Sequence, residues 1–146
     1  MKEKNDIQLA YLSFATRRLK VNLDQEIQMI LDESRKHNEE HGITGQLIYR
    51  GGIFLQLLEG DKDQVSLLLG RIMLDKTRHE NIKILLKQPL LKRVFPDWSM
   101  AYIKLDNVAL DIVNSIVPWQ NLISPKSENK NIPTDDILKI FTELAA

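Results

Sequence analysis

The apolar and polar positions predict strands and helices that alternate along most of the chain. Residues 7–14, IQLAYLSF, are apolar and rich in strand-favouring side chains, which predicts a first strand. Residues 22–42 then follow the 3.6-residue period of an amphipathic helix. Asp24 is a suitable N-cap for this helix, and Gly42 is the expected residue just past its end.

The middle of the chain predicts a hairpin, a second helix and two further strands. Residues 43–60 contain two apolar runs that an Arg-Gly-Gly turn separates. Residues 63–76 predict the second helix, with apolar side chains at i, i+3, i+4 and i+7: Val65, Leu68, Leu69 and Ile72. Residues 81–91 and 98–105 predict the last strands. The order β-α-β-β-α-β-β is a ferredoxin-like α+β plan with one extra strand, a sheet with both helices on one face.

A helical extension is predicted to follow this domain. We divide the chain into a domain of residues 1–105 and a C-terminal extension of residues 106–146. The extension contains a short helix that Pro118 ends, a polar linker around residues 124–133 and a last helix with Thr134 as N-cap. One side of the last helix is apolar: Ile137, Ile140, Phe141 and Leu144. We expect the extension to cover the helix-free face of the sheet or to dock on a partner.

A glutamine interrupts the apolar third strand. Gln56 shares a face of that strand with Phe54 and Leu58, because strand side chains alternate between faces. Burying its amide without partners costs about 1–3 kcal/mol. Taken alone, Gln56 is a paired core amide or a side chain that faces solvent beneath the extension.

Asn38 and Tyr11 are polar residues in similarly apolar surroundings. Asn38 follows Leu31 by seven residues and Ile30 by eight, so it continues the inward side of the first helix. The alternative is that the apolar side has ended and Asn38 caps the last turn near Gly42. Tyr11 lies within the first strand, where a phenol usually fills the core and its hydroxyl reaches solvent or a carbonyl.

Together these residues predict one site. The first and third strands are neighbours in a ferredoxin-like sheet, so Tyr11 and Gln56 lie side by side facing the helices. The end of the first helix carries Asn38 over the same region. A phenol and two amides between apolar helices suit a flat heteroaromatic ligand with carbonyls and ring nitrogens on its edge. Ile30 and Ile72, one from each helix, are placed to press on its two faces.

Composition excludes several other classes of protein. The 146 residues suit a single domain, and 43% hydrophobic with 27% charged residues is a globular composition. Twenty basic and twenty acidic residues cancel, so no overall charge favours nucleic acid or an anionic membrane. The N-terminus lacks the features of a signal peptide, and no apolar run reaches membrane-spanning length, which predicts a cytoplasmic protein.

Four segments occur in the order of a known family: LAYLS, HNEEHGITGQLIYRGGIFLQLLEG, RIMLD followed by RH, and FPDWSM. With them the chain resembles the BLUF domains, bacterial blue-light sensors that bind flavin, over residues 7–105. ITG, FLQ-x-LEG and W-x-M are weak signals singly but specific in this order. Two departures stand out. His37 precedes Asn38 where some members carry a second asparagine and others a histidine, and the loop DKTRH is one residue longer than the usual form. We expect His79 in that loop to be a surface or loop-anchoring histidine.

The resemblance implies a role for each matching residue. Tyr11 matches the tyrosine that gives an electron and a proton to photoexcited flavin. Gln56 matches the glutamine between that phenol and the flavin N5/C4=O edge. Asn38 matches the asparagine that bonds the C4=O/N3 side of the ring, with His37 beside it. Arg71 matches the arginine near the phosphate-bearing tail of the cofactor.

Two further pairs of residues match. Ile30 and Ile72 match the isoleucines that sandwich the ring. Trp98 and Met100 lie two apart on the last predicted strand, thus on one face. They match the pair whose exchange of inward position is proposed to transmit the signal, with ordinary core packing as the alternative for Trp98. Since the chain has no cysteine, a cysteinyl–flavin adduct is excluded.

The sequence thus predicts a blue-light photoreceptor rather than an enzyme, with non-covalently bound FAD, or FMN, as cofactor. Electron and proton transfer from Tyr11 rearranges Gln56, and a homo-oligomer or a downstream protein partner receives the signal. One alternative is a ferredoxin-like regulatory module that binds proteins and no photoactive flavin. Another is an acylphosphatase-type enzyme, which the absence of a Gly-rich loop ending in arginine after the first strand disfavours.

Overall fold

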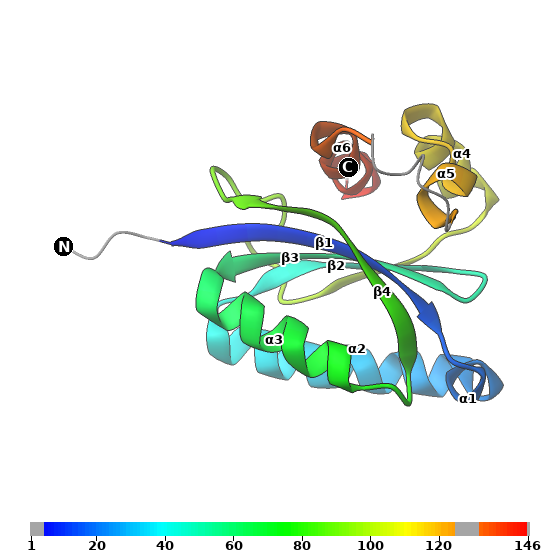
Figure 1. Cartoon of the computed structure of the whole chain (residues 1–146), viewed down its shortest axis with the longest axis horizontal. Coiled ribbons are helices and arrows are strands. Elements are labelled where there is room, and N and C mark those ends of the chain that lie inside the picture. Colours follow the sequence, from blue (N-terminus) through cyan, green and yellow to red (C-terminus); the bar gives the residue numbers. More distant parts are fainter. Residues whose placement is uncertain (1–4, 125–131, 146) are drawn as a thin grey trace.

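A five-stranded sheet lies between two layers of helices in the computed structural model, which describes residues 5–124 and 132–145 (Figure 1). The strands are β1 Asp6–Ala15, β2 Thr44–Arg50, β3 Ile53–Asp61, β4 His79–Pro89 and β5 Ala101–Lys104. Their order is β4-β1-β3-β2-β5, with β5 parallel to β2 and the other pairs antiparallel. The predicted ferredoxin-like plan with one extra strand is confirmed.

Two long helices, α2 Leu23–His41 and α3 Lys62–Leu74, lie side by side on one face of the sheet (Figure 1). Gly42 ends α2 in the left-handed conformation, with φ 67°, as predicted. Asp24 is not the N-cap. It lies in the first turn, because a short helix, α1 Arg17–Val21, comes directly before α2 and Asn22 joins the two. Thr16 caps α1 by accepting the amide of Leu19.

Glycines fix the hairpin of β2 and β3 and its place in the sheet. Gly51 and Gly52 have φ of 52° and 86°, the left-handed values that a tight two-residue turn needs. A Cβ at Gly45 would lie 1.9 Å from the backbone oxygen of Leu57. No other residue fits there without moving β3, which explains the glycine of the ITG segment.

The last strand is shorter than predicted, and this changes the setting of two site residues. β5 begins at Ala101, so Trp98 and Met100 precede it and do not share a strand face. Met100 is buried, whereas Trp98 is 53% exposed and stacks on Phe95. The segment leaves the regular ladder early because the amide of Gly45 donates to the carbonyl of Trp98.

The C-terminal extension covers the other face of the sheet. It forms α4 Asn107–Ile116, α5 Trp119–Ile123 and α6 Thr134–Ala145 (Figure 1). As predicted, α4 ends just before Pro118, at Ile116, and Pro118 is also the N-cap residue of α5. Thr134 is the first residue of α6 rather than its N-cap. Of the predicted linker, residues 125–131 lie outside the described residues. Covering the helix-free face, one of the two expected roles, is confirmed.

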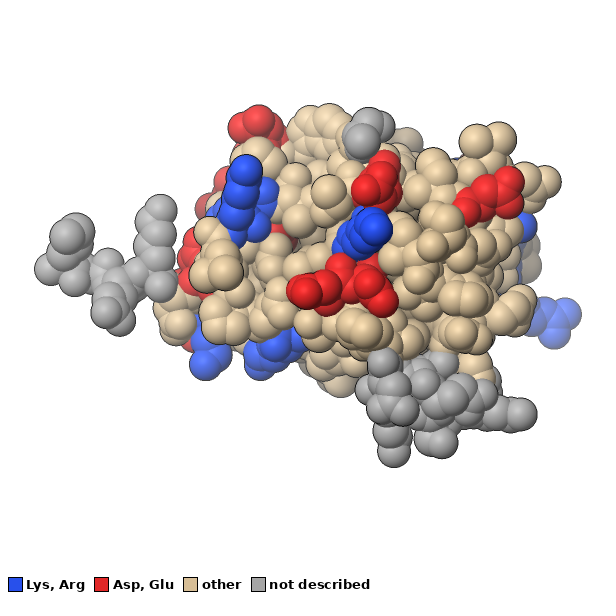
Figure 2. Space-filling view, turned by 90° about the horizontal axis from the view of Figure 1, so that it is seen from above, with Lys and Arg blue, Asp and Glu red and all other residues tan. Residues whose placement is uncertain are grey.

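An apolar core joins the extension to the sheet. The strands contribute every second residue to it, including Leu12, Ile48, Leu55 and Leu57, and the extension contributes Val113, Leu122, Ile137, Ile140 and Phe141. On the outside of this layer charged side chains are sparse in the visible part of the surface (Figure 2). Among the described residues, no helix is both long and apolar enough to cross a membrane.

Candidate functional site

A buried hydrogen-bonded chain of three side chains lies on the helix-covered face. Tyr11 and Gln56 are direct cross-strand neighbours on β1 and β3, 2% and 4% exposed. The Tyr11 hydroxyl donates to Oε1 of Gln56, and Nε2 of Gln56 donates to the sulfur of Met100 at 3.4 Å. Sequence alternation predicted the pairing of the first two, and the structure adds Met100 as its third member.

Burial sets the protonation of the phenol. With no charged group beside it, desolvation raises the pKa of Tyr11 well above its usual value of 10. Tyr11 is therefore a neutral hydrogen-bond donor over the physiological range, and the amide oxygen of Gln56 is its acceptor. A phenol held in this way keeps its proton unless it is first oxidised.

A cleft leads from the surface between α2 and α3 to this chain. Its outer cavity, about 200 Å³, is lined by Ile30 and Ile72 together with Glu33, Ser34, His37, Leu68, Arg71, Asp75, Arg78 and His79. Its inner cavity, about 40 Å³, shares Ile30, Ser34, Ile72 and His79 and ends on Tyr11, Leu47, Phe54 and Gln56. The structure thus brings together five of the predicted site residues, Tyr11, Ile30, Gln56, Arg71 and Ile72, and His37 at the outer wall.

Asn38 is completely buried and is not among the residues that line either cavity of the cleft. Its Nδ2 donates to the carbonyl of Ser99 at 2.8 Å, and its Oδ1 lies 3.4 Å from Nδ1 of His37. Its side chain faces inward, and only its backbone carbonyl serves the helix end by accepting the amides of Gly42 and Ile43. Asn38 therefore anchors the segment that carries Met100, and the capping interpretation of its side chain is wrong.

Arg71 and His37 stand at the mouth of the cleft. Arg71 is in the last turn of α3, and His37 stacks on His41 with ring centroids 4.2 Å apart. Trp98, by contrast, lies away from the cleft among residues of the segment before β5. In this arrangement Met100 is the inward member of the predicted pair.

The sequence-based search missed two residues of the cleft and one behind it. His79 was expected to be a surface or loop-anchoring residue, and it is an anchor: its Nε2 donates to the carbonyl of Ile72 at 2.8 Å. It also lines both cavities, and burial lowers its pKa below the usual 6.5. Among the described residues no group of histidines and carboxylates is arranged to hold a metal.

Arg78 closes the mouth of the cleft. Its guanidinium bonds both carboxylate oxygens of Glu33, at 2.7 and 3.2 Å, and lies within 4 Å of Glu26 and Asp75. It thus ties α2 to the end of α3 through a loop. In the sequence, the unusual length of the DKTRH segment, which contains Arg78, was the feature that pointed to this residue.

Glu59, the acid of the FLQ-x-LEG segment, lies behind the site. Its buried carboxylate accepts the amides of Val94 and Phe95 and the side chain of Gln8, all within 2.9 Å. The bonds from Val94 and Phe95 fix the loop that leads to Met100, and the bond from Gln8 ties the same carboxylate to β1. The motif therefore holds the loop on one side while Asn38 holds it on the other.

Fold and site together define a class of protein, an α+β domain with a ligand cleft that ends on a buried phenol–amide pair. Comparison with known families supplies the particular one. Residues 7–101 match the family model BLUF, described as sensors of blue-light using FAD. The chain belongs to this family.

Relatives and solved structures agree with the family assignment. The chain is 33% identical over 117 residues to the photoactivated adenylate cyclase subunit beta of Euglena gracilis, covering 80% of the chain but only 13% of that protein. The structure of the BlsA photo-activated state matches with a TM-score of 0.81 and 27% identity over 95% of this chain and 94% of that one. The dark-state structure of the BLUF protein BlrB matches with a TM-score of 0.72 and 26% identity, covering 97% and 96%.

Proposed function

We propose that this protein is a blue-light photoreceptor in which Tyr11 and Gln56 form the light-responsive switch. The observation that carries the proposal is the buried hydrogen bond from Tyr11 to Gln56 at the base of the cleft. Such a pair has no need of charge or metal, and it borders the inner cavity of the cleft and Met100. The function is sensing, not catalysis.

The types of side chain that line the cleft suit a flavin. Ile30 and Ile72 supply apolar faces for a flat ring, Gln56 supplies an amide for its polar edge, and Arg71 supplies a cation for a phosphate at the mouth. The two cavities are smaller than the roughly 300–1,000 Å³ typical of ligand pockets. The cleft must therefore widen to admit FAD or FMN.

A bound flavin would supply the chromophore for blue light and, once excited, the oxidant. Tyr11 would be the residue that gives one electron to this oxidant, and its proton would leave along the hydrogen bond to Gln56. Return of the electron and the proton to Tyr11 would restore the phenol and leave the amide of Gln56 rotated or tautomerised. Because the two ends of an amide differ, one as donor and one as acceptor, either change alters the bond toward Met100.

The signal then leaves through the segment before β5. Met100 is held by Gln56 through its sulfur and by Arg35, whose Nε donates to the Met100 carbonyl at 3.0 Å. A reversed amide would present its oxygen to the sulfur and weaken this hold, which frees Trp98 and Met100 to exchange places. We infer that residues 1–105 are the sensor and residues 106–146 the extension. The output is contact with a second copy or a partner protein.

Flavin uptake and absorption test this function. We expect purified protein to bind FAD or FMN, turn yellow and shift its absorption reversibly to longer wavelength under blue light. Gln56→Leu is the matched control, because it keeps the apolar cleft and should bind flavin without the normal shift. A colourless protein that takes up neither flavin contradicts the proposal.

A further inference from the structure

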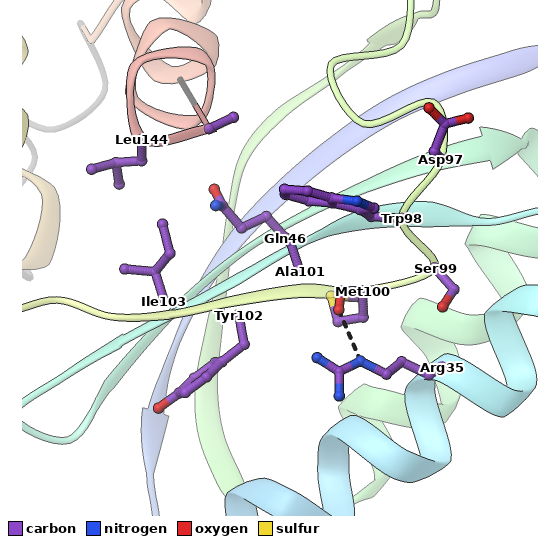
Figure 3. A pocket seen from close by; sticks show the side chains of 11 residues that line it. Arg35, Gln46, Asp97, Trp98, Ser99, Met100, Ala101, Tyr102, Ile103 and Leu144 are labelled. Atoms are coloured by element: carbon purple, nitrogen blue, oxygen red, sulfur yellow. Dashed lines mark hydrogen bonds between the residues drawn. The ribbon is translucent and has the colours of Figure 1, made fainter.

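A second cavity lies along β5, the edge strand of the sheet. It measures about 570 Å³ and is lined by the segment 97–103 together with Arg35, Gln46, Leu144 and Ala145 (Figure 3). Arg35 and Tyr102 lie on one side of β5, while Gln46, Trp98 and Ile103 lie on the other. The cavity therefore follows the strand edge on both faces, unlike the cleft between α2 and α3.

The backbone of β5 offers hydrogen bonds to this cavity. β5 is the last strand of the sheet, so its outer edge has no neighbouring strand among the described residues. The amide of Leu105 donates to Tyr49 of β2, and successive residues of a strand point to opposite sides. The amides of Tyr102 and Lys104 therefore face outward, as does the carbonyl of Met100 that Arg35 reaches.

A buried acceptor without a partner lines the same cavity. Gln46 is 1% exposed, and its Oε1 has no hydrogen-bond partner, one of two such side-chain atoms among the described residues. Its amide points toward α6, on the side of β5 that faces the C-terminal extension (Figure 3). A buried polar atom without a partner is destabilising, so its presence beside an open strand edge indicates a donor that arrives from outside.

Side chains along β5 indicate what the arriving segment carries, whereas Asp97, the carboxylate in the lining, lies at the Trp98 end of the cavity (Figure 3). On the helix side Arg35 and Lys104 are cations with no carboxylate in ion-pair distance among the described residues. On the side that faces the C-terminal extension, Ile103 and Leu144 are apolar. Trp98, half exposed at the end of the edge, is the kind of aromatic residue that dominates binding energy at interfaces.

We propose that the outer edge of β5 binds an extended segment of a partner protein as an added strand. The segment carries acidic residues toward Arg35 and Lys104 and apolar residues toward Ile103 and Leu144, in strict alternation. Its backbone pairs with Tyr102 and Lys104. Control of this binding by light rests on the proposed function, because Met100 precedes β5 directly and is bonded to Gln56.

A labelled peptide measures this docking directly. The probe is fluorescein-labelled Glu-Val-Glu-Val-Glu-Val-Glu amide, and its anisotropy is followed with the full-length, flavin-loaded protein in the dark. We expect saturable binding, loss of binding when lysine replaces the glutamates, and unequal effects of N-methylating the valine or the glutamate amides. Only the amides that face β5 are needed, so one methylated peptide binds and the other does not.

Two protein variants test the edge itself. Lys104→Pro removes the outward amide, whereas Lys104→Val removes only the charge, and proline is tolerated on an edge strand. We expect binding to the Pro variant to be about five-fold weaker than to the Val variant, the effect of one hydrogen bond. Gln46→Leu should weaken binding by a similar factor without lowering the melting temperature, because the amide oxygen it removes has no partner in the free protein.

Each contrary result overturns a defined part of the proposal. No saturable binding, or equal binding by both Lys104 variants and both methylated peptides, excludes strand addition. If sedimentation shows a dimer that Lys104→Pro dissociates, the occupant is a second copy and not a partner segment. Peptide binding by a protein that shows no absorption shift leaves the docking edge intact and contradicts the photoreceptor function. Equal peptide affinity in light and dark, together with a normal absorption shift, contradicts the proposed coupling through Met100.

Discussion

The two faces of the sheet come from the same strands but differ in chemistry. On the face covered by α4–α6, the core beneath the helices is apolar, and the buried polar residues of that face, Gln8, Gln46 and Glu59, lie outside this core. On the face covered by α2 and α3, Tyr11, Gln56 and Asn38 are buried among apolar residues, and a cleft separates the helices. The strands therefore present an apolar core to the extension and a buried phenol–amide pair to the cleft.

This difference separates stability from function. A close-packed apolar layer yields little to small changes, so it serves as a fixed support. In the proposed function, the polar layer contains the amide that rearranges and the helices between which the flavin ring binds. The described extension covers the opposite face of the sheet as a support, and Met100, directly before β5, connects the amide to the edge strand.

The largest effect is expected from truncating the apolar layer. Phe141 is completely buried beneath the sheet, and Phe141→Ala should lower the free energy of unfolding by about 3–5 kcal/mol. Ile72→Ala, on the half-buried wall of the cleft, is the matched change on the other face and should cost less. Urea denaturation measures both. Equal losses would contradict the division into a supporting and a working face.

The Tyr11–Gln56 pair should show coupled losses. Either Tyr11→Phe or Gln56→Leu leaves one buried polar group without its partner, which costs about 1–3 kcal/mol. The double variant removes both groups, so its loss should be clearly smaller than the two single losses added together. Unfolding free energies of the four proteins give the coupling, and strict additivity would show that the two residues do not interact.

A smaller effect is expected at the mouth of the cleft. Arg78→Gln removes an ion pair with Glu33, whose side chain is 61% exposed, so the loss should be about 1 kcal/mol or less. The loss should shrink further at high salt. Arg18, 64% exposed and 3.9 Å from Glu26, offers a control in Arg18→Gln with almost no effect. A salt-independent loss at Arg78 would point to packing instead.

The smallest effect is a pH trend from His79. Burial lowers its pKa below 6.5 in the folded protein, so below that pH the unfolded chain binds the proton more readily. Its contribution to stability is complete above pH 6.5 and is lost as the pH falls through the lowered pKa. His79→Gln, which keeps a donor for the Ile72 carbonyl, should flatten the decline between pH 7 and 5. An unchanged slope would exclude His79 as its source.

The sequence predicted the elements where burial is periodic. The ferredoxin-like order, the hairpin glycines and the pairing of Tyr11 with Gln56 all follow from alternation along strands and from turn chemistry. Asn38 was placed on the inward side of its helix by the same period, although its partner, the Ser99 carbonyl, lies 61 residues away. Long-range partners of this kind leave no periodic signal.

The segment before β5 shows most clearly what the sequence could not tell. WSMAYIKL has the composition of a full strand, yet only Ala101–Lys104 pairs with β2. Tertiary bonds from Gly45, Asn38 and Arg35 to three successive carbonyls hold the preceding residues out of the ladder. Because those donors come from distant elements, strand propensity alone overextended the strand and placed Trp98 and Met100 on one face.

The central claim is that Gln56, held between Tyr11 and Met100, is the light-responsive switch of the working face. The most direct test is a light-minus-dark absorption difference spectrum of the flavin-loaded protein beside its Gln56→Leu and Phe141→Leu variants. The account predicts a reversible shift to longer wavelength in the wild type and in Phe141→Leu, and none in Gln56→Leu. An undiminished shift in Gln56→Leu would contradict it.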